Sequence, residues 1–504
     1  MFRGSVRGDK PGNGGGMAER ILLAIDQGTT STRCMAFGDD GRPRHVEGRE
    51  LAQHYPQPGW VEHDPEDIWR DTVAVLEQVA EAAGGAPAAI GLANQRETVV
   101  LWDRATGTPL YKAIVWQDRR TAPLCARLKA DRCEAMVRAR TGLLLDPYFS
   151  GTKLAWLLDH VADARERAAR GGLAFGTIDS FLLWRLTGGR VHATDATNAS
   201  RTLLFNIHSG DWDDDLLTLL NIPRALLPEI RDTSGIFGET RLGGRPVPIG
   251  GMAGDQQAAL VGQACFRPGE AKSTYGTGCF LLLNTGDEPV ASSNGMLTTV
   301  AYRLGGKTTY ALEGAIFVAG AAVKWLRDGL GIIKHAAETE SLAADLADNG
   351  GVYMVPAFVG LGAPHWQPDA RAAISGLTFD AGRAHIARAA LESVAYQTAD
   401  LLDAMREDGA GAAQRIRIDG GMAANGWFCQ FLADIAGARI ERPASIESTA
   451  AGAAFLAGMA AGVWDGPDAL STVWQADGAF APDMPPNLRT SLRQGWDAAL
   501  ARSR

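Results

Sequence analysis

Apolar and polar positions at the start of the chain predict a strand, a tight polar turn and a second strand. A near-continuous apolar run, Ile21 to Ile25, leads into Asp26, and Met35 and Phe37 lie on one face of the return strand. The turn, Gln27 to Ser31, contains one glycine and three hydroxyl residues. We therefore expect a hairpin over this stretch.

Such a hairpin tip can hold a phosphate group. Gly28 lets the backbone approach a ligand closely, Arg33 adds a positive charge, and Asp26 can hold a hydrated Mg²⁺ ion. Short hydroxyl donors come from Thr29, Thr30 and Ser31. An ordinary polar hairpin turn explains the same residues about equally well, because short Gly/Thr motifs often occur by chance.

A second strand-turn-strand pattern occurs in the other half of the chain. Residues 271–284 repeat the arrangement, with Gly276, Thr277 and Gly278 at the tip. Two such hairpins predict a duplicated architecture of two domains, in which both hairpin tips contact one nucleotide bound between the domains. We place the boundary near residue 263, which gives domains of residues 21–263 and 264–504. Residues 1–20 are predicted to be a disordered extension, with Met17 as an alternative translation start.

Between the hairpins, helix and strand patterns alternate, as in an α/β fold. Asp64 and Pro65 suit the N-cap and first residue of a helix, and an apolar strand pattern follows at residues 88–103. Arg96 and Glu97 interrupt that strand. Because adjacent strand residues point to opposite faces, these two can share a ligand only if the strand ends or bulges there. An internal ion pair or a solvated strand end is an equally good interpretation.

Aromatic residues after other apolar segments are further candidates. Residues 111–120 place an exposed-type polar cluster after a short strand, with Trp116 inside it. Trp116 is more typical of a core residue than of a ligand contact. Tyr148 lies in the loop before a predicted helix, where a lone tyrosine is usually half-buried.

In the second half, candidate residues lie at the starts of helices. Asp255 and Gln256 begin one predicted helix, and Gly320 and Lys324 lie one turn apart on another. Gly420 and Gly421 let the backbone approach a flat ligand such as an adenine ring, with Asn425 on the first turn that follows. A simple strand-to-helix turn explains the same glycines.

Composition narrows the possible partners. A net charge of −9 argues against nucleic acid or an anionic membrane surface as the main partner, because both require basic patches. No stretch is apolar enough for stable insertion into a bilayer, and residues 450–464 are expected to form a buried helix. Six scattered cysteines without metal-type spacing indicate reduced core thiols of a cytoplasmic protein: Cys34, Cys125, Cys133, Cys265, Cys279 and Cys429.

Several separated motifs together resemble the FGGY group of carbohydrate kinases, from residue 21 to about residue 496. In chain order they are DQGTTSTR, YPQPGWVEHDPEDIW, NQRETVVLWD, AIVWQDRRT, DPYFSGTK, AGDQQAALVGQ, STYGTGCF, ALEGAIFVAGA and IDGGMAANG. The resemblance implies an α/β fold of two ribonuclease-H-like domains, of the actin and hexokinase type, with ATP, Mg²⁺ and substrate in the cleft. Within the group it closely resembles members that phosphorylate glycerol to sn-glycerol 3-phosphate.

The resemblance also implies a role for each candidate residue. Glycerol would be contacted by Arg96, Glu97, Trp116, Tyr148, Asp255 and Gln256, with Trp116 as the apolar wall and Asp255 as the general base. The nucleotide would be contacted by Thr29, Thr30, Ser31, Arg33, Thr277, Gly320, Gly421 and Asn425, and Asp26 would hold the metal. Lys324 stands beside the nucleotide where related kinases often have Gln, so the nucleotide preference stays open.

Two other functions compete with glycerol phosphorylation. One is a kinase of the same group that acts on another polyol or a ketose, and the other is an actin-like ATPase. Arg96 and Glu97 beside the bulky Trp116 favour a small triol, because the pocket wall leaves little room for a longer chain. The candidate base Asp255 argues against a simple ATPase. The resemblance further suggests a homodimer or homotetramer.

Overall fold

The structure is a computed structural model that describes residues 19–84 and 86–503. Most of the predicted extension, residues 1–18, lies outside the described residues. Of the two described residues of that segment, Glu19 pairs with Arg44 at 2.6 Å and Arg20 donates a hydrogen bond to the carbonyl of Gly462 at 2.9 Å. Residues 19 and 20 are therefore tied to the folded chain.

The first large sheet contains the predicted amino-terminal hairpin. Its strands, in order across the sheet, are β13 (Ser234–Leu242), β14 (Arg245–Gly254), β5 (Ala89–Asn94), β1 (Leu22–Gln27), β2 (Ser31–Phe37) and β3 (Pro43–Glu50). β1 pairs antiparallel with β2, with Asp26 opposite Arg33, and parallel with β5, which itself pairs parallel with β14. The hairpin prediction is confirmed.

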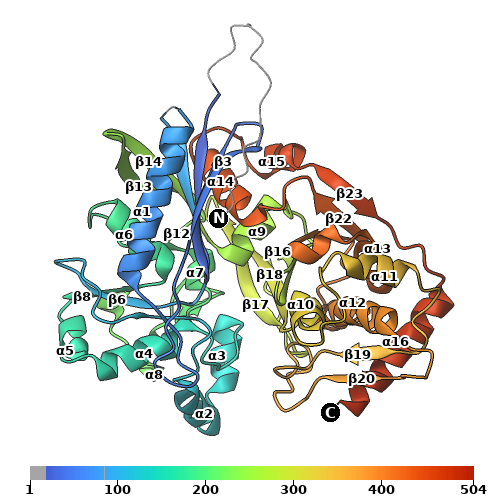
Figure 1. The fold of residues 1–504 in the computed structure, drawn as a ribbon. Coiled ribbons are helices and arrows are strands. Elements are labelled where there is room, and N and C mark those ends of the chain that lie inside the picture. The colour runs from blue at the N-terminus through green and yellow to red at the C-terminus, as the bar shows by residue number, and fades with distance from the viewer. Residues whose placement is uncertain (1–18, 85, 504) are drawn as a thin grey trace, which may run out of the picture.

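The second large sheet repeats the topology of the first. Its strands are β17 (Leu297–Leu304), β18 (Lys307–Ile316), β16 (Cys279–Gly286), β15 (Glu270–Tyr275), β21 (Arg415–Asp419), β22 (Arg439–Pro443) and β23 (Ala476–Phe480). β15 pairs antiparallel with β16 and parallel with β21, and β21 pairs parallel with β22. The order β16, β15, β21 and β22 matches the order β2, β1, β5 and β14, so the predicted duplicated α/β architecture is confirmed. Figure 1 shows the two halves side by side, with α1 in the first and α12 in the second.

Helices cover the outer faces of both sheets, because each sheet has apolar side chains on both faces. α1 (Pro65–Ala82) and α6 (Ile178–Leu186) pack on the first sheet through a core that includes Leu23 and Ile25. α12 (Arg383–Glu407) and α13 (Gly426–Ala436) cover the outer face of the second sheet, and α16 (Pro486–Arg502) packs on these two helices. As predicted, Asp64 caps α1 by accepting a hydrogen bond from the amide of Glu66.

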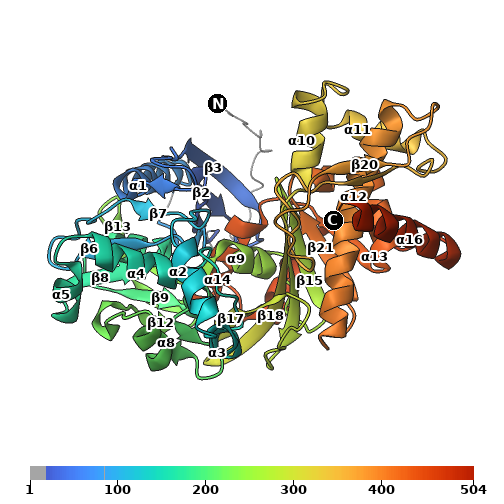
Figure 2. The ribbon, with the colours of Figure 1, turned by 90° about the horizontal axis from the view of Figure 1, so that it is seen from below.

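Two helices lie between the sheets (Figure 2). α9 (Asp255–Gly262) and α14 (Ser448–Ala460) share one apolar core with Leu22 of the first sheet and Leu282 of the second. The buried helix predicted at residues 450–464 is confirmed as α14, which ends four residues earlier, at Ala460. Although α14 comes late in the sequence, it packs on β14, β5 and β1 of the first sheet.

Glycines allow α9 and α14 to approach closely. A Cβ atom added at Gly452 would lie 1.8 Å from the carbonyl oxygen of Ala258. A Cβ atom at Gly262 would lie 1.9 Å from the carbonyl oxygen of Ser448. No side chain fits at either position, so this helix pair depends on glycine.

Shorter elements complete both halves. In the first half they are β4 (Glu62–His63), β6 (Val100–Asp103), β7 (Ala113–Ile114), α2 (Ala122–Ala130), α3 (Glu134–Thr141), α4 (Ser150–His160), α5 (Ala164–Ala169), β8 (Leu173–Gly176), β9 (Ala193–Asp195), α7 (Ala196–Ala199), β10 (Phe205–Asn206), β11 (Asp211–Trp212), α8 (Asp214–Leu219), a 3₁₀ turn (Arg224–Leu226) and β12 (Glu229–Arg231). In the second half they are α10 (Gly320–Asp328), α11 (Glu338–Ala344), β19 (Tyr353–Val355), β20 (Ala373–Ser375), a 3₁₀ turn (Gly421–Ala424) and α15 (Pro467–Val473).

Two local expectations were wrong. In the segment 111–120, Asp118 and Arg120 are buried rather than exposed, because they bond to each other and Arg120 also pairs with Glu62. Cys133 is only half-buried, whereas the other five cysteines are buried as expected. None of the described helices has the length and apolar character needed to cross a membrane.

Candidate active site

Strand β5 ends at Asn94, just before the predicted substrate residues Arg96 and Glu97. The backbone of Glu97 has φ = 63°, in the left-handed region, so the chain turns sharply there. Both side chains are buried, with only 3% of Arg96 and 1% of Glu97 exposed. The strand end required for a shared ligand is confirmed. The internal ion pair, which was the alternative interpretation, is also present.

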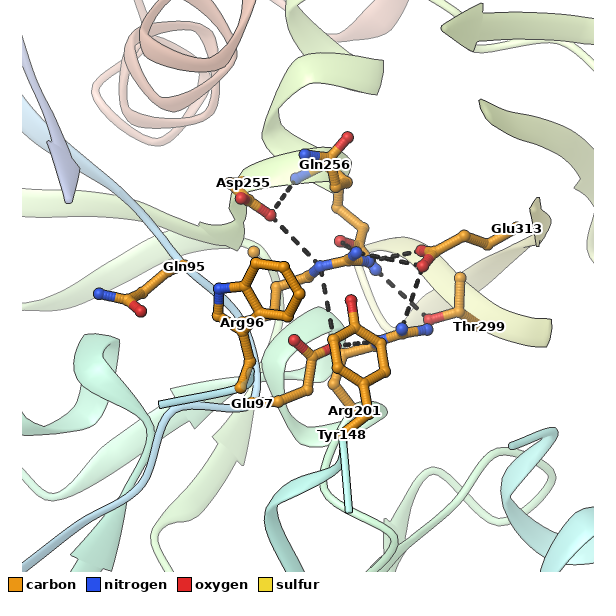
Figure 3. A network of polar contacts seen from close by, with 12 residues as sticks. Gln95, Arg96, Glu97, Tyr148, Arg201, Asp255, Gln256, Thr299 and Glu313 are labelled. Atoms are coloured by element: carbon orange, nitrogen blue, oxygen red, sulfur yellow. Dashed lines mark hydrogen bonds and ion pairs between the residues drawn. The ribbon is translucent and has the colours of Figure 1, made fainter. Parts of the chain in front are cut away.

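Two arginines and two glutamates form one buried network (Figure 3). The Nη1 atom of Arg96 lies 2.5 Å from an oxygen of Glu313 on β18. Arg201 donates from Nε to Glu97 at 2.7 Å and from Nη2 to Glu313 at 3.0 Å. Burial by itself would raise the pKa of Glu313, but the Arg201 and Arg96 guanidiniums outweigh it and lower that pKa to about 2. Glu313 therefore stays ionised and fixes both guanidiniums.

Asp255 is the first residue of α9, at the edge of this network. One of its carboxylate oxygens lies 3.3 Å from Nε of Arg96, and 29% of its side chain is exposed. Burial raises the pKa of Asp255, although the nearby Arg96 charge acts in the opposite direction. A carboxylate with a raised pKa is a stronger proton acceptor than an ordinary aspartate.

Trp116 links the predicted substrate and phosphate residues. Its ring lies edge-on to that of Tyr148, with 5.5 Å between the centroids, and its Nε1 donates to the Thr29 hydroxyl at 2.9 Å. Trp116 is half-buried rather than a core residue. Burial raises the pKa of Tyr148, so the phenol keeps its proton.

The loop that carries Tyr148 is held by Lys153 of α4. The Lys153 ammonium is fully buried and donates to the carbonyls of Pro147, Tyr148 and Phe149 at 2.8, 2.6 and 3.0 Å. All three of its hydrogens are thus used on three consecutive residues. This arrangement fixes the backbone on both sides of Tyr148.

At the first hairpin tip, Arg33 is not a free positive charge. Its guanidinium lies 2.8 Å from Asp26 and 2.9 Å from Glu447, a residue that precedes α14. Burial raises the pKa of Asp26, with Arg33 opposing the effect. Two carboxylates therefore neutralise the predicted positive charge of Arg33. The three hydroxyl residues of the tip are half-buried or exposed: Thr29, Thr30 and Ser31.

The second hairpin tip meets two of the other predicted nucleotide segments. Thr277 is exposed, and the amide of Gly320 donates to the carbonyl of Gly276 at 2.9 Å. Gly420 has φ = 85°, and a Cβ atom there would lie 2.4 Å from the carbonyl oxygen of Tyr275. The hairpin tip, the start of α10 and the turn that begins at Gly421 therefore lie together.

The remaining nucleotide candidates lie around this cluster. Asn425 accepts a hydrogen bond from the amide of Phe428 at 2.9 Å, so its carbonyl oxygen already serves as the N-cap of α13. Lys324 is exposed on α10, one turn after Gly320. The amide of Gly320 is likewise engaged, so its own N–H does not point at a ligand.

Several residues of the site were missed in the sequence. They are Lys153, Arg201, Lys272, Glu313 and Glu447. Lys153 and Glu313 each interrupt an apolar stretch of a helix or strand, which is the only local signal in the sequence, whereas Lys272 lies in the largely polar strand EAKSTY and carries none. All three are fully or almost fully buried. Lys272, Glu313 and Arg201 contact residues in other elements of the chain, so the local sequence pattern does not identify these contacts.

The donor set is compatible with a magnesium ion held mainly by a nucleotide. Within residues 19–84 and 86–503, no three His, Cys, Asp or Glu side chains are grouped as a metal-binding set. Mg²⁺ is usually bound through one or two carboxylates, together with phosphate oxygens and water. Asp26, a buried carboxylate at the end of β1, fits this requirement.

Two family models match the two halves of the chain. The model of the FGGY family of carbohydrate kinases, N-terminal domain, matches residues 21–262, and that of the C-terminal domain matches residues 271–461. Glycerol kinase of Gluconobacter oxydans is 61% identical over 486 residues, which cover 96% of this chain and 95% of that protein.

A second sequence and a solved structure are also similar to this chain. Glycerol kinase of Rhodospirillum centenum is 62% identical over 494 residues, which cover 97% of this chain and 99% of that protein. The crystal structure of Plasmodium falciparum glycerol kinase with ADP is 37% identical, with a TM-score of 0.92, and the match covers 96% of this chain and 98% of that one. The chain therefore belongs to the FGGY family of carbohydrate kinases.

Proposed function

We propose that the protein transfers the γ-phosphoryl group of ATP to glycerol, giving sn-glycerol 3-phosphate. The main support is the convergence of Arg96, Glu97, Tyr148 and Asp255 in one network beside the first hairpin tip. The relatives that are about 60% identical over nearly the full chain are named glycerol kinases, which agrees with this substrate.

In this proposal the hydroxyls of glycerol are held by complementary groups. Arg96 can only donate hydrogen bonds, the Glu97 carboxylate can only accept them, and the Tyr148 phenol can do both. Trp116 and Tyr148 form an apolar wall that suits a three-carbon chain. Asp255 accepts the proton of the attacking hydroxyl, and Arg96 at 3.3 Å orients its carboxylate.

Most of the rate comes from positioning and charge neutralisation, because phosphoryl transfer passes through a loose transition state. A general base adds about 10²- to 10⁴-fold. Thr29, Thr30, Ser31 and Arg33 contact the phosphates, and Arg33 exchanges its Glu447 partner for a phosphate oxygen. When bound, Mg²⁺ supplies positive charge that offsets the charge of the transferring phosphoryl group, and Asp26 holds it.

The second half of the chain binds the rest of the nucleotide. Thr277 and Gly320 contact the β-phosphate and ribose, and Gly421 and Asn425 contact the adenine. The exposed amine of Lys324 is available to the nucleotide and is the residue to vary when ATP is compared with other triphosphates. The boundary near residue 263 falls between α9 and β15, and we keep it as the division between the two domains.

We also propose that the protein acts in the cytoplasm and forms a homodimer or homotetramer. Exposed apolar side chains gather on the second half, where Phe317 lies 6.3 Å from Trp366 between ring centroids. Phe358 and Val359, which lie on the same loop as Trp366, are also exposed. Light scattering of the purified protein gives the oligomeric state directly.

The test of the function is ATP-dependent release of ADP with different acceptors. Glycerol, dihydroxyacetone, erythritol, xylulose and a reaction without acceptor are compared at equal enzyme concentration. We expect a strong preference for glycerol. A preference for another polyol overturns the argument about pocket size, and release that needs no acceptor places the protein among the ATPases.

A further inference from the structure

Lys272 is a buried cation beside the candidate base that the mechanism above does not use. It lies on β15 and is 0% exposed. Its ammonium donates to the side-chain carbonyl of Gln256 and to the Thr274 hydroxyl, the latter at 2.9 Å. A buried charge is costly without partners, so this placement requires a compensating interaction.

The charges around Lys272 come from several elements. Asp419 at the end of β21 and Asp255 at the start of α9 attract it, whereas Arg96 repels it. Burial lowers the pKa of Lys272, and the two carboxylates oppose that shift. Lys272 thus joins the second sheet to the first residues of α9.

The chemistry of lysine fixes the orientation of the Gln256 side chain. An ammonium has hydrogens to donate and no lone pair to accept with, so the amide atom facing it must be Oε1 of Gln256. The amide nitrogen, Nε2, then points the other way. Within the described residues Nε2 is not among the buried polar atoms that lack a partner. Among the described residues no hydrogen bond from Nε2 is found either, so Nε2 is accessible to solvent.

We propose that Lys272 is a positioning residue that holds the Gln256 amide with its N–H groups toward the substrate. Asp255 accepts a hydrogen bond and Gln256 donates one, so two consecutive residues offer opposite polarity to the polyol. The pair therefore selects a substrate with a hydroxyl donor and an oxygen acceptor on neighbouring atoms. The substrate part of this inference rests on the proposed function, whereas the Lys272–Gln256 contact does not.

The first test is Gln256→Glu, with Gln256→Met for comparison. A glutamate keeps an oxygen for Lys272 and preserves the fold, but it has no hydrogen to donate. We expect both variants to raise the KM for glycerol by at least about tenfold, with a smaller change in kcat. A Gln256→Glu enzyme with a near wild-type KM means that Gln256 accepts from the substrate, and the proposal is then wrong.

The second test is a double-mutant cycle between Lys272→Met and Gln256→Met. Each protein is measured for its urea midpoint without ligand and for its glycerol KM. We expect coupling in both quantities, so that the double variant has a KM within about twofold of Gln256→Met alone. Additive effects on KM mean that Lys272 supports the fold without orienting Gln256.

Arg417→Met is the matched control. Arg417 on β21 is the register partner of Lys272, is also buried, and bonds to the carbonyls of Gln263 and Ala264. We expect it to lower the urea midpoint, to leave the glycerol KM unchanged, and to be additive with Gln256→Met. The wild-type rate with glycerol tests the proposed function, and the ligand-free coupling tests the contact, so the two failures are distinguishable.

Discussion

Replacing Glu313 by glutamine is expected to destabilise the protein and weaken substrate binding together. Glu313 is 1% exposed and receives hydrogen bonds from both Arg96 and Arg201. The glutamine amide fills nearly the same volume but carries no charge, so two buried guanidiniums lose their shared counter-charge. Removing one partner of a buried ion pair costs about 3–5 kcal/mol in other proteins.

The pKa of Glu313 gives a separate measure of this loss. It falls from an ordinary 4.5 to about 2 in the folded protein. At ~1.36 kcal/mol per pKa unit, that difference corresponds to about 3 kcal/mol of stability. Because the pKa is lowered on folding, this stability is fully present above pH 4.5 and is lost as the pH falls toward 2.

The assay is urea unfolding of wild type and Glu313→Gln at several pH values, together with glycerol kinetics at pH 7. We expect the free energy of unfolding of the variant to be about 3 kcal/mol lower than that of wild type at pH 7. We expect this difference in free energy to narrow below pH 4.5. The glycerol KM is expected to rise, because Arg96 is no longer held. A gap that stays constant on acidification would refute the reasoning.

Glu441→Gln is the control for a general effect of losing a buried carboxylate. Glu441 on β22 is 5% exposed and lies 2.8 Å from Arg439 and 3.4 Å from Arg417. Its partners are not among the proposed substrate residues. We expect lower stability with an unchanged glycerol KM.

Three further predictions follow from the site and the packing. Asp255→Asn is expected to lower kcat by about 10²- to 10⁴-fold with little change in glycerol KM. In wild type, kcat/KM should fall on the acid side as Asp255 is protonated, at a pH above the ordinary value of 3.8, and steady-state kinetics across pH check both statements. Lys153→Met removes three hydrogen bonds from the loop that carries Tyr148, so we expect a higher glycerol KM and about 3 kcal/mol less stability in urea titrations. Gly452→Ala places a methyl group 1.8 Å from the Ala258 carbonyl, and we expect thermal unfolding to show a loss of about 3 kcal/mol. Gly382→Ala, with nothing within 4 Å, should be nearly neutral in the same measurement.

Much of the fold could be predicted from the sequence, because local patterns determine it. The hairpin from Leu22 to Phe37 and its counterpart at 271–284 each combine alternating apolar residues with a glycine turn. The duplicated topology of the two sheets could be inferred from these two hairpins. At Arg96 and Glu97, both interpretations were partly right. The strand ends there, and the two residues also belong to an ion-pair network.

The partners of that network could not be predicted, because they depend on tertiary contacts. Glu313 meets Arg96 across 217 positions of sequence, and Lys272 meets Gln256 through the packing of β15 beside α9. The same holds for Glu447, which neutralises Arg33 from a segment far along the chain. Charge at a single position indicates a possible site, but the identity of its counter-charge requires the fold.

Helix α14 has a consequence for how the protein is made. It covers the inner face of the first sheet, against Leu22 and Ala24, yet it leaves the ribosome only after residue 460 has been synthesised. Until then, that apolar face has no permanent cover, and a nascent chain ending near residue 263 exposes it. The first half therefore completes its core only after most of the second half has been translated.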